Sequence, residues 1–200
     1  MSLHPPLYRT PTSVAETLTQ HTASIASHTA SIASIVQGDP VLAVATASGD
    51  TTMDFEMTGG YEEYHIHVYD AIPSTDSVVA RLRTSSDGGV TFDSGATDYT
   101  WDKNGSLDAD DTGIAISGSV GSGANEGLST LIKIFRPSET NYTLITAAGH
   151  FVNISGYITQ STTDGKRKQN AAVTHIQLLF SSGNVATGLF VLKGIRTTLL

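Results

Sequence analysis

Aromatic and acidic side chains lie close together in the segment DYTWDKN, residues 98–104. A sugar ring packs on an aromatic face, while carboxylate and amide groups form hydrogen bonds with its hydroxyls. The types and spacing of these residues therefore predict a glycan-binding cluster. Its candidate members are Tyr99, Trp101, Asp102 and Asn104. The same residue types also serve as ordinary core and turn residues in a β-protein, so the sequence leaves that second interpretation open.

Recognisable catalytic motifs are absent from the sequence. Asp98 and Asp102 could form the acid pair of a glycosidase, but that reaction depends on a carboxylate separation that a sequence does not give. The chain has no cysteine and no G-x-S-x-G nucleophile elbow. Its glycine-rich residues 118–127 lack the lysine of a phosphate-binding loop. We therefore expect a protein that is not an enzyme and has no catalytic residues.

Two motifs have partial metal-binding character. His65 and His67 lie on one face of a predicted strand, and the alternative is a polar sheet face that they share with Glu63 and Tyr69. The segment DKNGSLDADD, residues 102–111, begins like a calcium-binding loop but is followed by glycine where that loop needs a bidentate glutamate. We expect no metal site and no cofactor, and we expect residues 102–111 to form a solvated acidic loop.

The segment SSDGGVTF, residues 85–92, fits one copy of the Asp-box pattern of sialidase-like propellers. A propeller needs several copies and a longer chain, so the pattern predicts a hairpin rather than a sialidase site. Asp87 is expected to accept hydrogen bonds within the turn. Gly88 and Gly89 are expected to supply positive φ angles, and Phe92 to return the chain to the core.

A heptad pattern precedes the strand-like part of the chain. Apolar residues and histidines recur at a and d positions between a capping box, Ser13 to Glu16, and a Gly-Asp-Pro stop at residues 38–40. The predicted seam consists of Val14, Leu18, His21, Ile25, His28, Ile32 and Ile35. The β-branched a positions favour a parallel trimer. The alternative is an amphipathic helix that lies on the chain's own domain.

Composition and charge argue against several classes of function. The net charge of −8 and the pI near 5.2 argue against a nucleic-acid partner, whose phosphates require Lys and Arg. The basic run Lys166, Arg167, Lys168 follows Asp-Gly and is predicted to be a solvated turn. The sequence shows neither a signal peptide nor a membrane-spanning apolar segment, so we expect no membrane partner. The absence of cysteine fits assembly in a reducing cytoplasm.

After Pro40 the hydrophobic period becomes two residues, which is typical of β-strands. The predicted strands are 51–57, 61–72, 78–85, 89–92, 98–101, 113–118, 128–136, 142–152, 173–181 and 188–195. Their spacing predicts an all-β, jelly-roll-like two-sheet sandwich, preceded by the N-terminal trimeric coiled-coil helix. The expected domains are an anchor peptide at 1–12, a coiled-coil stalk at 13–38 and a β-sandwich head domain at 41–200.

Two blocks of the predicted head resemble a recurrent β-domain in virion proteins of tailed bacteriophages and prophages, commonly fibre or spike proteins. They are residues 61–101, which begin YEEYHIHVYDAIP, and residues 176–195, IQLLFSSGNVATGLFVLKGI. The unit IASHTAS, residues 25–31, also resembles the I-x-x-N-T-x-x layers of trimeric surface adhesins and viral fibres, with histidine in place of asparagine. The resemblance implies a structural protein of the virion, made in the host cytoplasm.

Together these observations predict a homotrimeric phage fibre or spike whose β-sandwich head attaches to polysaccharide on the host surface. Its N-terminus is expected to bind other virion proteins. The alternative is a capsid decoration or connector protein that binds no ligand. A third possibility is a glycan depolymerase.

Overall fold

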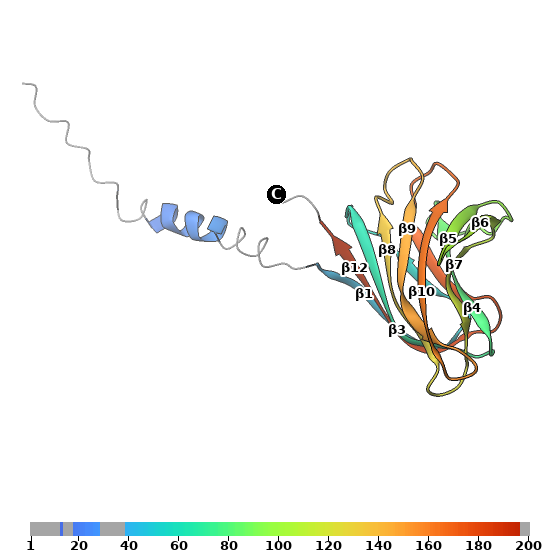
Figure 1. Cartoon of the computed structure of the whole chain (residues 1–200). Coiled ribbons are helices and arrows are strands. Elements are labelled where there is room, and N and C mark those ends of the chain that lie inside the picture. Colours follow the sequence, from blue (N-terminus) through green and yellow to red (C-terminus); the bar gives the residue numbers. More distant parts are fainter. Residues whose placement is uncertain (1–12, 14–17, 29–38, 197–200) are drawn as a thin grey trace, which may run out of the picture. The chain divides into compact units, whose positions relative to one another are not determined.

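The structure is a computed structural model that describes residue 13, residues 18–28 and residues 39–196, except the side chain of residue 110. The chain divides into two compact units, Met1–Gly38 and Asp39–Leu200. The described part of the first unit contains a helix, and the described part of the second contains twelve β-strands (Figure 1). The prediction of an all-β sandwich for the second unit is confirmed.

The helix spans residues 18–28, and all of its side chains are exposed. Leu18 and Ile25, two predicted a positions, are each 65% exposed. His21 and His28, two predicted d positions, share one helix face with them because residues three and four apart are neighbours on a helix surface. The other predicted seam residues, Val14, Ile32 and Ile35, lie outside the described residues. The described helix therefore carries a one-sided stripe of two apolar and two histidine side chains.

The strands form two antiparallel sheets, one of eight strands and one of four (Figure 1). In spatial order, the larger sheet consists of β1 (Val41–Asp50), β12 (Val185–Ile195), β3 (Glu63–Pro73), β8 (Gly127–Phe135), β9 (Leu144–Val152), β10 (Ile158–Arg167), β5 (Tyr99–Lys103) and β6 (Ser106–Asp111). The smaller sheet consists of β2 (Met53–Glu56), β11 (His175–Phe180), β4 (Val78–Ser85) and β7 (Ile114–Val120). Most strands that are consecutive in the chain lie in different sheets, so the chain passes repeatedly between the two layers.

The hydrophobic core follows the two-residue period of the strands. Along β3, Tyr64, Ile66 and Val68 are buried, while the residues between them face the other side of the sheet, as the sequence pattern predicts. β8 and β11 show the same alternation of buried and half-buried side chains. Full burial of a large apolar side chain stabilises the fold by about 1.5–3 kcal/mol, so this pattern fixes which face of each strand points inward.

Two predicted segments between β4 and β7 have different structures from those expected. Residues 89–92, predicted as a strand, belong to an irregular loop over residues 86–98. Amides of this loop donate to nearby side chains in place of a sheet ladder, namely Gly89 to Ser85, Thr91 to Asp87 and Gly95 to Asp98. Residues 102–111, predicted as a solvated loop, form most of the β5–β6 hairpin. Its turn residues Asn104 and Gly105 have φ angles of 52° and 82°, which fit the type I′ turn that Asn-Gly favours.

The prediction of a solvated turn for the basic run at residues 166–168 is wrong. Lys166 and Arg167 are the last two residues of β10, and Arg167 is fully buried. Alternation along β10 turns Arg167 toward the core. A buried guanidinium is tolerated only with a charged and hydrogen-bonded partner, and Asp93 supplies one: Arg167 Nε donates to Asp93 Oδ2 at 2.6 Å.

Candidate functional site

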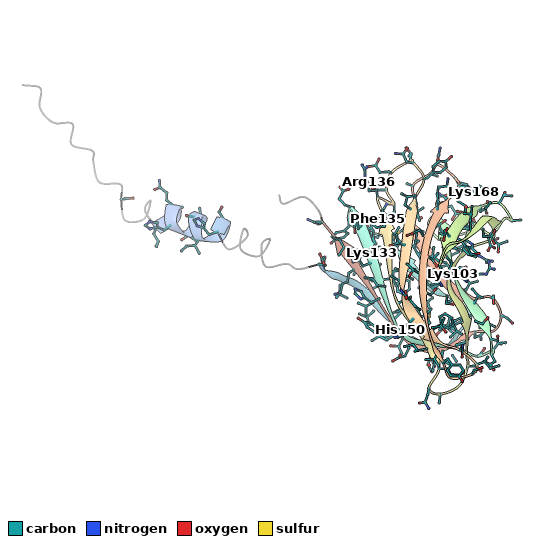
Figure 2. The ribbon with its side chains drawn as sticks, in the orientation of Figure 1. Lys103, Lys133, Phe135, Arg136, His150 and Lys168 are labelled. Atoms are coloured by element: carbon teal, nitrogen blue, oxygen red, sulfur yellow. The ribbon has the colours of Figure 1, made fainter. Side chains whose placement is uncertain are left out.

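A groove lies on the outer face of the eight-stranded sheet, over β8, β9, β10, β5 and β6. Its volume of about 570 Å³ falls within the range of sites that bind small ligands. The apolar part of its lining includes Phe135, Leu144 and Leu107, and the charged part consists of Asp102, Asp164 and Lys166. Figure 2 shows Phe135 on β8, with Lys133 on the same strand. The groove therefore combines an apolar wall with a few polar groups.

Strand pairing explains why these side chains converge. In the antiparallel ladder, Asp164 of β10 lies directly opposite Asp102 of β5, and Lys166 lies opposite Leu144 of β9. Directly opposite residues on one face have Cβ atoms about 4.5–5.5 Å apart. The two carboxylates are therefore neighbours. Asp102 Oδ1 also accepts a hydrogen bond from the Gly105 amide at 2.8 Å, which fixes its position at the turn.

An exposed aromatic ring lies beside the charged part of the groove. Lys166 Nζ lies 4.4 Å from the centroid of the Tyr142 ring, and Tyr142 is about half exposed. This distance is typical of a cation–π contact. The contact holds the Lys166 ammonium close to a ring in the loop before β9.

Tyr99 does not belong to a surface cluster. Its side chain is fully buried, and its hydroxyl accepts a hydrogen bond from the Thr84 amide at 2.7 Å and donates one to the Asp93 carbonyl at 3.2 Å. Burial raises the pKa of Tyr99 to about 12. A fully buried ring cannot contact a sugar, so the structure corrects the assignment of Tyr99 to the glycan-binding cluster.

Trp101 lines the groove, but its indole also has a structural role. Its ring packs against the core, and Nε1 donates to Asp111 Oδ2 at 3.1 Å. Arg81 of the smaller sheet donates to the other oxygen of the same carboxylate. Burial raises the pKa of Asp111, but the hydrogen bonds from Arg81 and the Thr112 amide outweigh burial and lower it below its ordinary value. This network joins the β5–β6 hairpin to the smaller sheet.

Asn104 fastens the hairpin turn to the neighbouring strand. The backbone N–H of Asn104 donates to the Thr162 carbonyl at 3.0 Å, and the side-chain Oδ1 of Asn104 accepts from the Thr162 backbone N–H at 2.9 Å. Asp98, the other residue of the possible glycosidase pair, accepts a hydrogen bond from the Gly95 amide at 2.7 Å in its own turn. Trp101 and Asp102 are therefore the predicted ligand residues that line the groove.

Sequence reasoning missed Asp164, Lys166, Leu144 and Phe135 as groove residues. β10 has small or polar residues on both of its faces, so its sequence does not show the apolar alternation of a strand. Without β10, the cross-strand partners of Asp102 and Leu144 cannot be identified. The alternating polar residues Thr162, Asp164 and Lys166 are the weak signal that was available.

His65 and His67 lie on the outer face of β3, as the sequence predicted. His65 Nε2 lies 3.1 Å from a Glu63 carboxylate oxygen, and the His67 ring stacks on Tyr69 with centroids 6.1 Å apart. Burial is the main cause that lowers the pKa of His67, and the charges of Lys193 and His65 lower it further. Within the described residues, no group of three His, Cys, Asp or Glu side chains could hold a metal ion.

A second, smaller hollow lies on the same outer face, between β3, β8 and β9. Its volume is about 260 Å³, and its lining includes His67, Tyr69, Leu131 and His150. Figure 2 shows His150 toward the opposite end of the sheet from Phe135. This hollow is separate from the groove, because the two linings share no residue.

The loop with the Asp-box pattern has the predicted hydrogen bonds to Asp87 and the predicted glycine angles, but it is not the predicted hairpin. Asp87 accepts hydrogen bonds from the Thr91 hydroxyl at 2.6 Å, from the Thr91 amide at 3.0 Å and from the Ser85 hydroxyl at 2.7 Å. These bonds, above all the one from the Thr91 hydroxyl, hold the pKa of Asp87 well below its ordinary value. Gly88 and Gly89 both have a φ of 79°, as expected. The loop is also tied to other parts of the head, because the Gly88 amide donates to the Thr174 hydroxyl and Arg167 donates to the Ser86 hydroxyl, and Phe92 is only half-buried.

Comparisons with known proteins give no family assignment. The chain matches no protein-family model and no curated protein. Within its described residues, no helix is long and apolar enough to cross a membrane.

Proposed function

We propose that the chain is a structural protein of a bacteriophage virion, a homotrimeric fibre or spike whose head binds a glycan of the host surface. The observation that carries this proposal is the groove, where Asp102 lies directly opposite Asp164 in a lining that also contains the apolar side chains of Leu107, Leu144 and Phe135. Like charges directly opposite one another destabilise a sheet. Such a local conflict is typical of residues kept for binding rather than for folding.

The groove has the chemistry of a site for neutral or amino sugars. Apolar side chains such as Leu144 and Phe135 supply a surface on which the C–H groups of a sugar ring can pack, and carboxylates accept hydrogen bonds from its hydroxyl or ammonium groups. The two negative charges of Asp102 and Asp164 exceed the single positive charge of Lys166 in the lining, so the groove disfavours anionic sugars. The proposal therefore favours neutral or amino-containing polysaccharides over acidic ones.

The exposed stripe of the helix supports the trimeric part of the proposal. Leu18 and Ile25 are each 65% exposed, and isolated helices of this length are marginal in water. Association of three copies buries these side chains. Three heads on one assembly also bind a repetitive polysaccharide with greater avidity than one head. The repeated passage of the chain between the two sheets supports a jelly-roll-like description of the head.

Binding of the full chain to an array of neutral, amino-containing and acidic polysaccharides tests the glycan site. We expect binding to neutral or amino-containing glycans, and we expect Asp164→Asn to weaken it at least tenfold. The matched control is Asp54→Asn, the same change at an exposed position of β2 in the smaller sheet. Binding that survives Asp164→Asn contradicts the groove as the site. A trimer with no glycan ligand favours a decoration or connector protein, and release of reducing ends favours a depolymerase.

Analytical ultracentrifugation tests the oligomeric state separately. We expect a mass of about 63 kDa, three times that of the 21.0 kDa chain. A monomer at micromolar concentration contradicts the trimer.

A further inference from the structure

The two sheets have four edge strands, and three of them carry protection against pairing with other chains. An open edge presents unpaired N–H and C=O groups, and proteins shield such edges with short strands, charged side chains or covering groups. β2 has four residues, two of which are Asp54 and Glu56. β6 has six residues and three aspartates. Both strands therefore follow the ordinary rule for edges.

The edge strand β7 is covered by side chains of the larger sheet. Ser161 and Thr163 donate hydrogen bonds to the carbonyls of Ile116 and Ala115 at 3.2 and 2.9 Å. Lys103 Nζ donates to the Ser117 carbonyl at 2.9 Å. These contacts satisfy carbonyls of three consecutive residues.

The edge strand β1 has an irregular register between Val41 and Ala43, but along most of its length it lacks charged side chains and covering groups. It is ten residues long, and its first nine residues, VLAVATASG, include neither a charged residue nor proline. Among the described residues, side-chain hydrogen bonds to β1 lie near its end, from the Ser48 amide to Asp50 and from the Asn184 side chain to the Gly49 carbonyl. In the described part of the chain, residues 41–47 pair with β12 on one side and with no strand on the other.

Exposed apolar side chains continue from this edge across the outer face of the sheet. We define the edge patch as Val41, Val44, Tyr69, Leu189 and Val191. Val44 lies opposite the half-buried Val191, and Leu189 lies opposite Tyr69, so apolar side chains follow one another over β1, β12 and β3. Lys193 lies opposite Val41 and borders the patch. Val44 is 61% exposed and Val41 is 54% exposed. A contiguous apolar surface of this kind marks an interaction site.

We propose that the edge patch is a contact between heads, in which the edge patches of neighbouring copies of this chain meet around the symmetry axis. The expected occupant is a second copy of the chain, because copies that associate through their helices hold their heads close to one another. Only 12 residues separate the helix from Val41, a distance of at most about 45 Å in extended chain. Copies joined through their helices therefore present their edge patches to one another at millimolar effective concentration. Mutual contact covers the apolar side chains and blocks the open edge.

Cross-linking through an introduced cysteine tests this contact in the full chain. The natural sequence has no cysteine, so a single Val44→Cys substitution gives one reactive position per copy. We expect a short bismaleimide to join most chains into covalent dimers. The matched control is Ile158→Cys on β10, which lies on the same outer face and is 71% exposed. A yield for Val44→Cys no greater than that for Ile158→Cys overturns the proposal.

A second pair of variants tests whether the cross-link arises from a packed contact between heads or from chance collisions of heads that are tethered together. In the Val44→Cys background, Leu189→Lys places charges inside the edge patch, so we expect the cross-linking yield to fall at least threefold. Ile158→Lys in the same background is the control and is expected to leave the yield unchanged. An equal yield in both double variants means that the heads only collide, and the proposal is then wrong.

The tether argument rests on the oligomer in the proposed function, but the two can fail separately. A trimer by sedimentation without a Val44 cross-link overturns the edge contact and leaves the fibre proposal standing. A monomer by sedimentation overturns the trimer together with the contact. Loss of glycan binding concerns the groove and affects neither result.

Discussion

The Arg167→Met substitution tests the buried ion pair that joins the end of β10 to the loop over residues 86–98. Arg167 is 0% exposed, and its guanidinium donates to Asp93 at 2.6 Å and to the Ala171 carbonyl at 2.8 Å. Methionine fills much of the same volume but leaves the Asp93 carboxylate without its cation. Removal of one partner of a buried pair costs about 3–5 kcal/mol. The Asp93 side chain is 16% exposed, so water offsets part of this cost. We expect the free energy of unfolding to fall by about 3 kcal/mol.

Urea unfolding followed by tryptophan fluorescence measures this change. The slope of the free energy against urea should stay constant, since the surface exposed on unfolding is nearly unchanged. Lys166→Met is the matched control, because it removes the same charge from the neighbouring residue, which faces the groove. We expect it to cost less than about 1 kcal/mol.

The double variant Arg167→Met/Asp93→Leu completes the test. A buried ion pair can often be replaced by apolar residues at little cost, so the double variant should be more stable than Arg167→Met. A loss below about 1 kcal/mol for Arg167→Met, or a double variant less stable than that single variant, would refute the assignment of this pair as an internal clamp.

Three further predictions concern single residues of the head. Gly105→Ala should lower the free energy of unfolding by about 1 kcal/mol, because alanine is disfavoured at the positive φ of the hairpin turn while its methyl group meets open space; urea unfolding measures this. Asp87→Asn should reduce the fall in melting temperature below about pH 4. The pKa of Asp87 is lowered in the folded state, so its carboxylate stabilises the fold above the ordinary carboxyl pKa, and this stabilisation is lost in acid. His67→Gln should reduce the fall in melting temperature between pH 7.5 and 5.0. The pKa of His67 is lowered in the folded state, so the neutral imidazole stabilises the fold at neutral pH, and this stabilisation declines as pH falls below about 6.5.

Strands with one strongly apolar face could be predicted from the sequence, whereas strands with small or polar faces could not. β3, β8 and β11 alternate large apolar residues with polar or half-buried ones, and their positions agree with the prediction. β10 turns Ser161, Thr163, Gly165 and Arg167 inward, so its buried face has no apolar signal. β1 consists mainly of small residues on the sheet edge. The hydrophobic period cannot identify strands of these two kinds.

The candidate site was predicted only in part for a related reason. Asp102 is visible as an acidic residue beside tryptophan, but its neighbour Asp164 is 62 positions away in the chain and becomes adjacent only through the β10–β5 ladder. The inward orientation of Tyr99 also depends on that ladder. Asn104 and Gly105 are a strong local signal for a hairpin, but the acidic residues around them also resemble the start of a calcium-binding loop.

The position of β12 sets the order in which the head can be completed during synthesis. β12 is the last described strand in the chain, yet it lies between β1 and β3 (Figure 1). In chain order, β1 and β3 are the first two strands of the larger sheet. Until Ile195 has left the ribosome, β1 has no partner in its sheet and β3 has an open side. Pairings between residues so distant in the chain form slowly and leave apolar strands exposed meanwhile. The larger sheet can therefore close over β1 and β3 only after residues 185–195 are free to pair with both strands.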